Sequence, residues 1–140
     1  MSTSPTPIQE IRTRSSLYSL RPDGLIIQVT LPNIAQTLDD AKENVAAFVR
    51  LAAGKKHPLL VDTRVIHSQA AGVREYYAGP EAMEYTLAIA VLIGSGAGRV
   101  IGNLFLAVSA PKTPTRLFTD ETEAIAWLLK ITRVLEASGR

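Results

Sequence analysis

The residues with the clearest chemical potential follow one short apolar run. Asp62 and Arg64 come directly after Pro58–Val61, and His67 and Ser68 lie a few residues further on. In open α/β sheets, ligands bind at the carboxyl ends of the strands. One interpretation is therefore a charged pair in a ligand crevice, joined by His67 and Ser68. The alternative is that Asp62 accepts backbone N–H groups of its own turn while Arg64 is solvated.

Ser68, His67 and Asp62 are the residue types of a Ser-His-Asp catalytic triad, but their spacing in the sequence does not favour nucleophilic catalysis. Adjacent residues on a strand or loop tend to point apart, so His67 is badly placed to take the Ser68 proton. The nucleophile elbow Gly-x-Ser-x-Gly is missing from the sequence, since Gly94-Ser95-Gly96 has different spacing. We therefore predict no catalytic residue and no enzymatic activity.

Metal and cofactor sites are not predicted either. The chain has no cysteine, so thiolate zinc sites and cysteine nucleophiles are excluded. His57 and His67 flank one strand without a third ligand that converges on them. The run Gly94–Gly98 before Arg99 could hold a small anion at a helix N-terminus, although Arg99 replaces the third glycine of a dinucleotide fingerprint. A tight strand-to-helix turn is the alternative.

Length, charge and hydropathy patterning bound the remaining classes. The 140 residues fit one domain. The net charge is +2 and only Lys55-Lys56 are adjacent basic residues, so we predict no nucleic-acid partner. Glycines and polar residues interrupt the most apolar region, 87–110, which argues against a membrane span. No signal peptide is visible in Met1–Thr13, and we expect a cytoplasmic protein without membrane association.

The elements that must position these residues alternate along the chain. Arg21-Pro22-Asp23-Gly24 predicts a tight turn between two strands. Thr37 predicts a helix N-cap and Gly54 the end of that helix. The sequence predicts strands over 16–21, 25–31, 58–62, 87–93 and 115–118, and helices over 38–53, 70–78, 99–108 and from a cap at Thr119 to 135. Segments 1–14 and 136–140 are predicted to be a disordered lead-in and a flexible tail. We expect one α/β domain over 15–135, a mixed, mostly parallel sheet of about five strands with four packed helices.

The predicted helix 99–108 is apolar almost all round. A surface helix normally has a polar face, so this helix is enclosed, lines an apolar ligand pocket, or presents an apolar strip to another subunit. Enclosure is difficult in a small domain, and we favour a homodimer interface. Asn103 would then need a hydrogen-bond partner such as Arg116. The candidate contact residues for a partner or ligand are Asp62, Arg64, Ser68, Arg99, Asn103, Phe105 and Arg116.

The order of elements and several motifs resemble the STAS/SpoIIAA-like group, small α/β domains that include anti-sigma-factor antagonists. The resemblance covers residues 15–132. It is carried by 59–64 (Leu-Leu-Val-Asp-Thr-Arg) at the third strand and by Gly72 near the second helix. The stretches 76–81, 99–103 and 115–118 look like an uncharacterised side branch. The resemblance implies a STAS-like fold and function through protein–protein contact.

Some members of this group are switched by phosphorylation of a serine within Asp-Ser-Ser/Thr-Gly. The matching stretch here is His67–Gly72, and it places Ala70 at the phosphoacceptor and Gln69 at the preceding aspartate. Ser68 can act as the acceptor only if the loop is repositioned. We keep Ser68 as the candidate phosphorylation site.

We therefore expect a non-enzymatic protein-interaction or regulatory module that forms a homodimer, needs no cofactor and has a possible protein partner. The alternative is a carrier of a small apolar or lipid-like ligand, held between the 99–108 helix and the sheet.

Overall fold

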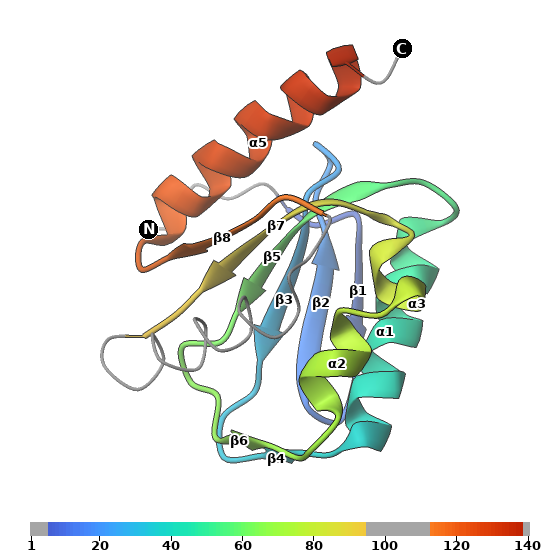
Figure 1. The fold of residues 1–140 in the computed structure, drawn as a ribbon, viewed down its shortest axis with the longest axis vertical. Coiled ribbons are helices and arrows are strands. Elements are labelled where there is room, and N and C mark those ends of the chain that lie inside the picture. Colours follow the sequence, from blue (N-terminus) through green and yellow to red (C-terminus); the bar gives the residue numbers. More distant parts are fainter. Residues whose placement is uncertain (1–5, 95–112, 139–140) are drawn as a thin grey trace.

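A six-stranded sheet forms the centre of the structure, a computed structural model that describes residues 6–94 and 113–138 (Figure 1). In spatial order its strands are β1 (Gln9–Arg12), β2 (Ser16–Leu20), β3 (Ile26–Thr30), β5 (His57–Asp62), β7 (Thr86–Leu92) and β8 (Thr115–Phe118). The first three are antiparallel neighbours, whereas β3, β5, β7 and β8 run parallel. The mixed, mostly parallel sheet is as predicted, with six strands instead of about five.

Helices cover both faces of this sheet. The helices α1 (Leu38–Ala52), α2 (Val73–Tyr77) and α3 (Pro80–Met83) lie on one face, and α5 (Glu121–Ser138) lies on the other (Figure 1). The short strands β4 (Ala35–Gln36) and β6 (Ser68–Gln69) pair in parallel, and they precede α1 and α2, respectively, in the chain. No helix within the described residues is long and apolar enough to cross a membrane.

The hairpin between β2 and β3 forms as the turn residues predict. The Arg21 amide donates to the Leu25 carbonyl at 2.9 Å, and the Gly24 amide donates to the Arg21 carbonyl at 3.0 Å. Gly24 has a φ of +90°, which glycine adopts at little steric cost. The hairpin places Tyr18 and Gln28 on the same face of the sheet as α1.

Helix α1 begins at the predicted cap. The Thr37 hydroxyl accepts from the Asp40 amide at 3.1 Å, and the Asp40 carboxylate accepts from the Thr37 amide at 2.8 Å. This reciprocal capping satisfies two amides that the helix leaves unpaired. At the other end, Ala53 (φ 51°) and Gly54 (φ 81°) take left-handed conformations that stop the helix.

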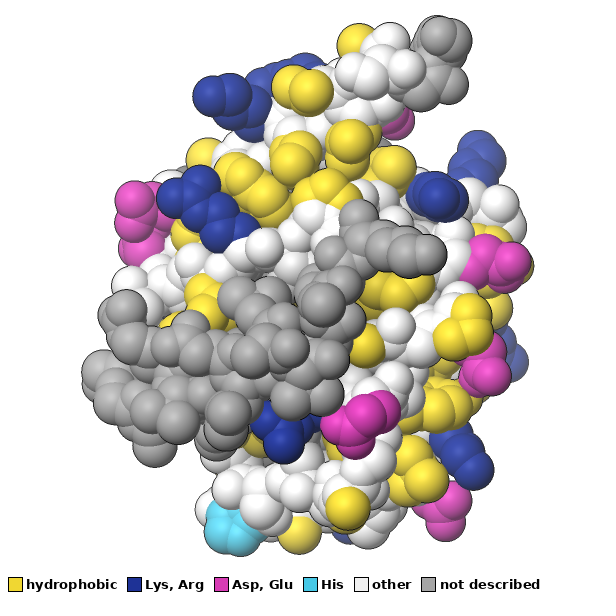
Figure 2. All heavy atoms as spheres, viewed as in Figure 1, with side chains coloured by type: hydrophobic (Ala, Val, Ile, Leu, Met, Phe, Trp, Pro, Cys, Tyr) yellow, Lys and Arg dark blue, Asp and Glu magenta, His cyan; other side chains and the backbone are white. Residues whose placement is uncertain are grey.

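The face under α5 is closely packed because β7 presents small side chains there. Ala88 and Ala90 are fully buried against Ala124 and Leu128 of α5. Trp127 packs against the same cluster, and its ring centroid lies 5.7 Å from that of Phe118. Hydrophobic side chains gather along α5 and just below it (Figure 2).

Several predicted boundaries are wrong. Strand β1 lies within the segment 1–14 that was predicted to be disordered, because Ile11 packs beside β2 and α1. The second predicted helix begins only at Val73, since Gly72 before it has a left-handed conformation (φ 87°) that is not helical. Helix α5 continues to Ser138, so residues 136–138 of the predicted flexible tail are helical. Asp120 caps this helix instead of Thr119: its carboxylate accepts from the Glu123 amide at 2.9 Å.

The predicted helix 99–108, with the candidate residues Arg99, Asn103 and Phe105, lies outside the described residues. The described residues include the other candidates, Asp62, Arg64, Ser68 and Arg116.

Candidate functional site

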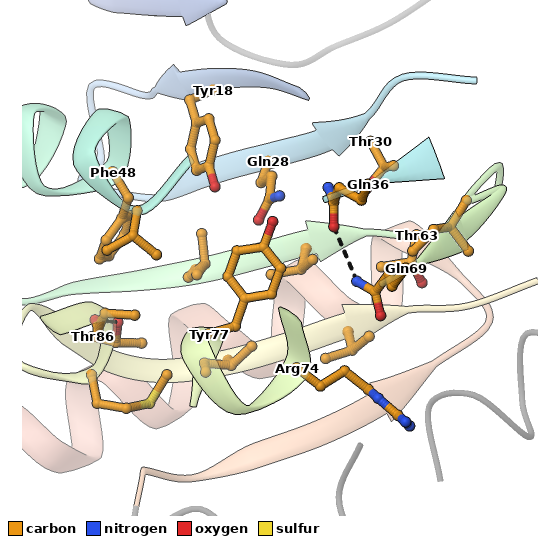
Figure 3. Close-up of a pocket in the computed structure, with 18 residues that line it drawn as sticks. Tyr18, Gln28, Thr30, Gln36, Phe48, Thr63, Gln69, Arg74, Tyr77 and Thr86 are labelled. Atoms are coloured by element: carbon orange, nitrogen blue, oxygen red, sulfur yellow. Dashed lines mark hydrogen bonds between the residues drawn. The ribbon is translucent and has the colours of Figure 1, made fainter. Parts of the chain in front are cut away.

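A pocket of about 100 Å³ lies between the sheet and the helices α1, α2 and α3 (Figure 3). Its apolar wall comes from the parallel strands β5 and β7, the helices α1 and α3, and the loop residue Ile66. The apolar lining residues are Val45, Phe48, Leu59, Val61, Ile66, Ala82, Met83, Ile89 and Val91. Alternation along β5 and β7 places Leu59, Val61, Ile89 and Val91 on this face while Leu60, Ala88, Ala90 and Leu92 face α5. The sequence thus builds a pocket wall and a packed core from the same strands.

A buried polar cluster borders the opposite side of the pocket. Asn44 of α1 is completely buried, and its side-chain nitrogen lies within hydrogen-bonding distance of the hydroxyls of Ser15, Ser16 and Tyr77, at 3.0, 3.2 and 2.8 Å. Its carbonyl oxygen accepts from the Thr13 hydroxyl. Buried polar groups are tolerated only when they are hydrogen-bonded, and this cluster lies behind the pocket lining, where it holds Tyr77, Gln28 and Gln36.

Glutamines extend the polar rim along the sheet. The Gln28 amide donates to the Ser16 hydroxyl at 3.2 Å, and the Gln36 amide donates to the Ser15 hydroxyl at 3.3 Å. The Gln69 amide in turn donates to the Gln36 carbonyl oxygen at 3.1 Å (Figure 3). The pairing of β4 with β6 brings these last two side chains together.

Two tyrosines point into the pocket from opposite sides. Tyr18 comes from β2 and Tyr77 from α2, and the Tyr77 hydroxyl points toward Gln28 (Figure 3). Burial raises the pKa of Tyr77 to about 12 and raises the pKa of Tyr18 well above its ordinary value. Both phenols therefore stay neutral at physiological pH and act as hydrogen-bonding groups, not as bases.

Arg74 is the cationic residue of the pocket lining. It also borders a second, more polar groove of about 370 Å³ lined by Ile66, the run Ser68–Gly72, and Glu75. Its guanidinium points away from Tyr77 (Figure 3), and it takes part in none of the ion pairs found among the described residues. Arginine recognises carboxylates and phosphates through paired N–H donors. Arg74 is thus placed to meet an anionic group at the edge of the pocket.

The sequence-predicted pair Asp62 and Arg64 lies elsewhere and serves a contact between elements. The Arg64 guanidinium donates to both Asp62 carboxylate oxygens at 3.0 and 2.7 Å, and reaches Glu121 of α5 at 3.2 Å. Asp62 also accepts from the Arg64 amide at 3.1 Å. The interpretation that Asp62 accepts a backbone N–H of its own turn is therefore correct, and Arg64, although 44% exposed, is also paired with Asp62 and Glu121. The hydrogen bonds that the Arg64 guanidinium donates to Asp62 are the main cause of the raised pKa of Arg64.

The structure does not assemble Ser68, His67 and Asp62 into a catalytic set. Ser68 lies in β6 and lines the polar groove, His67 is exposed, and the Asp62 carboxylate is engaged by Arg64. The nitrogens of the other histidine, His57, lie 2.8 and 3.1 Å from the carbonyl oxygens of Gly24 and Ala52. Within the described residues, no three His, Asp or Glu side chains gather as a metal site.

Ser68 and Arg116 are the other described candidates. Ser68 precedes α2 by several residues and is paired with Ala35 across the small sheet, so it does not occupy the helix start at Gly72. Arg116 is exposed on β8, and its guanidinium carbon lies 5.0 Å from the centre of the Phe118 ring. Neither residue lines the central pocket.

The residues predicted from the sequence do not include the polar residues that line the pocket or Asn44, which holds the lining residue Tyr77. Gln28 and Thr30 share the inward parity of the buried Ile26 on β3, and Asn44 lies within the apolar stripe of α1. Polar residues at core positions of two elements were the available signal. Their convergence depends on the way α1 crosses the sheet, which neither segment specifies by itself.

Comparisons with known proteins bear on the fold. The family described as "Domain of unknown function (DUF7793)" matches residues 18–132. A crystal structure of an uncharacterized DUF3478-family protein with a SpoIIAA-like fold, from Shewanella loihica PV-4, is similar with a TM-score of 0.57 and 15% identity, over 91% of this chain and 98% of that chain. A protein with unknown function from Arthrobacter sp. FB24 is 29% identical over 80% of this chain and 97% of that chain, with a TM-score of 0.31.

The comparison with curated proteins gave no match. The Shewanella structure confirms the predicted SpoIIAA-like fold, and at its level of identity it carries no information on function.

Proposed function

Because the chain belongs to the family described as a domain of unknown function (DUF7793), its role must be argued from its own site, and we propose a non-enzymatic regulatory module that binds a small molecule. The ligand has a short apolar body, which fills the central pocket, and an anionic end, which meets Arg74. The observation that carries this proposal is the pocket itself, apolar along β5 and β7 and polar along one rim.

The size and lining of the pocket limit the ligand. A volume of about 100 Å³ accommodates about four to six non-hydrogen atoms, by comparison with an apolar cavity of about 150 Å³ that binds benzene. A few placed polar groups in a mainly apolar pocket orient a ligand. Val61 and Val91 contact the hydrocarbon part of the proposed ligand, and Arg74 meets its charged end.

The location supports a regulatory role. Arg74, Tyr77, Ala82 and Met83 of the pocket belong to the short helices α2 and α3. A ligand that contacts these helices stabilises one of their arrangements, and a protein partner that binds their outer surface then responds to occupancy. The site differs from the alternative carrier site expected beside residues 99–108, which lies outside the described residues.

The first experiment uses 3-methylbutanoate and its neutral isostere 3-methylbutanamide as probes. We expect 3-methylbutanoate to raise the melting temperature and to give saturable binding by calorimetry, because free-energy stabilisation grows as the ligand concentration exceeds Kd. The amide fills the same volume without the charge, so its binding should be weaker by about tenfold. No saturable binding of either probe at about 10 mM would argue against the pocket as their site.

Two variants locate the binding. Ala82→Leu adds side-chain volume to the pocket and should abolish binding of 3-methylbutanoate, whereas Ala46→Leu makes the same change at an exposed position of α1 and should leave it intact. Arg74→Ala should remove the preference for the acid over the amide, with Arg50→Ala as the exposed control. Unchanged acid preference in Arg74→Ala would contradict the assignment of the anionic end.

A further inference from the structure

Strand β1 is an edge strand of the sheet, and within residues 6–94 and 113–138 one of its sides has no strand partner. The sheet order begins at β1, and β2 is its partner. Gln9, Glu10 and Arg12 are exposed, and Ile11 is partly buried against the core beneath α1. An exposed edge is a surface on which another strand can add main-chain hydrogen bonds.

The register with β2 decides which backbone groups of β1 face outward. Thr13 pairs with Ser16, and the Thr13 amide donates to the Ser16 carbonyl at 2.8 Å. Hydrogen-bonded and non-hydrogen-bonded pairs alternate along antiparallel strands. The amide and carbonyl groups of Ile11 therefore face β2, whereas those of Glu10 and Arg12 face away from the sheet.

The side chains of these two residues carry opposite charges on one face of the sheet. Residues two apart on a strand point to the same side, so an acidic side chain, Glu10, and a basic side chain, Arg12, lie next to each other on one face of β1. Glu10 accepts a long hydrogen bond of 3.3 Å from the Ser19 hydroxyl. Arg12 takes part in none of the ion pairs found within residues 6–94 and 113–138.

We propose that a second copy of this chain pairs antiparallel with β1, about a two-fold axis at Ile11. Glu10 then lies opposite the partner subunit's Arg12, and Arg12 lies opposite the partner subunit's Glu10. Both residues have outward amide and carbonyl groups, so the two copies exchange hydrogen bonds at these positions. The Ile11 side chains of the two copies meet on the face that carries α1. The two sheets become continuous.

Other registers fail on charge or on hydrogen bonding. A shift by two residues places Glu10 opposite its own copy, or Arg12 opposite its own copy, and like charges directly opposite destabilise a strand pair. A shift by one residue places Glu10 or Arg12 opposite the partner subunit's Ile11. The amide and carbonyl groups of Ile11 already face β2, so these pairs cannot exchange hydrogen bonds. The charge pattern thus selects one self-complementary arrangement, as a symmetric interface requires.

The test measures association by sedimentation velocity from about 10 μM to about 1 mM, because an interface of one short strand is expected to be weak. We expect the wild-type chain to move from monomer to dimer in this range. E10R and R12E each place like charges opposite one another and should weaken the dimer by at least about tenfold. The double variant E10R/R12E restores opposite charges and should associate like the wild type.

An equimolar mixture of the E10R chain and the R12E chain provides the sharpest control. Each variant repels itself, but the two attract each other in the proposed register, so a heterodimer should form. Circular dichroism and melting curves for every variant serve as the control that each one is folded. A wild-type chain that stays monomeric throughout the range, or a mixture that associates no better than its components, would overturn the proposal. None of these measurements depends on ligand binding in the pocket.

Discussion

At the residue scale, Asn44 joins more of the structure than any other polar side chain described above. It connects the residues before β2 to Tyr77 of α2 by hydrogen bonds at the rim of the pocket. Asn44→Ala removes one hydrogen bond from each of the buried hydroxyls of Thr13, Ser15, Ser16 and Tyr77 and should lower the free energy of unfolding by about 2–4 kcal/mol. Lys42→Ala, at an exposed position of the same helix, should change it by less than about 0.5 kcal/mol. Urea denaturation compares the two variants.

The lowered pKa of Asp40 makes the stability of the fold depend on pH in the acid range. The Arg14 guanidinium, which donates to this carboxylate at 2.8 and 2.7 Å, lowers the pKa of Asp40 to about 2 from an ordinary value of 3.8. Because the folded pKa is lowered, the ionised carboxylate stabilises the fold above about pH 4, and this contribution is lost as the pH falls toward 2.

The loss should amount to about 1–2 kcal/mol, since Arg14 is 57% exposed and solvent screens the pair. Asp40→Asn should remove this part of the acid dependence. Asp39→Asn, one position away and exposed, should retain it. Chemical denaturation at a series of pH values between 2 and 5 measures the difference, and equal slopes in Asp40→Asn and wild type would contradict the assignment.

At the scale of elements, α5 depends on few residues for its attachment to the sheet. Leu128 is fully buried between Ala88, Ala90 and Leu92 of β7. Leu128→Ala opens a cavity there and should cost about 2–5 kcal/mol of unfolding free energy. Val134 of the same helix is 55% exposed, so Val134→Ala should cost less than about 1 kcal/mol. Similar losses in both variants would mean that α5 is held in another way.

The elements also show what the sequence can and cannot specify. Strand β8 has the predicted bounds, and α1 begins at its predicted cap, because turn and capping residues mark both locally. Strand β1 was missed, since Ser, Thr and Pro dominate the segment before Ile8 and only Ile11 indicates burial. The pocket was missed for a different reason: Asn44 and Gln28 are far apart in sequence, and their meeting depends on packing between α1 and the sheet. The pair Asp62–Arg64 was found, but its attachment to Glu121 required the position of α5.

At the scale of the whole molecule, the two faces of the sheet should differ in local stability. The face under α5 is a continuous apolar cluster, whereas α2 and α3 are short helices that border a pocket. Short elements with few buried contacts open more readily than core strands. We expect amide hydrogens of residues 73–83 to exchange at least about tenfold faster than those of β7, as measured by hydrogen exchange with mass spectrometry. A bound 3-methylbutanoate should slow exchange in 73–83 selectively.

The left-handed residue at the end of α1 is a position where a substitution should increase the stability of the protein. Ala53 occupies a conformation (φ 51°) that glycine adopts without steric penalty. Ala53→Gly should therefore strengthen the native state by about 0.5–1 kcal/mol, even after the added freedom of the denatured chain is counted. This single substitution, remote from the pocket and from β1, would thus give a more stable protein. Destabilising substitutions at other positions could then be studied in it without unfolding the chain.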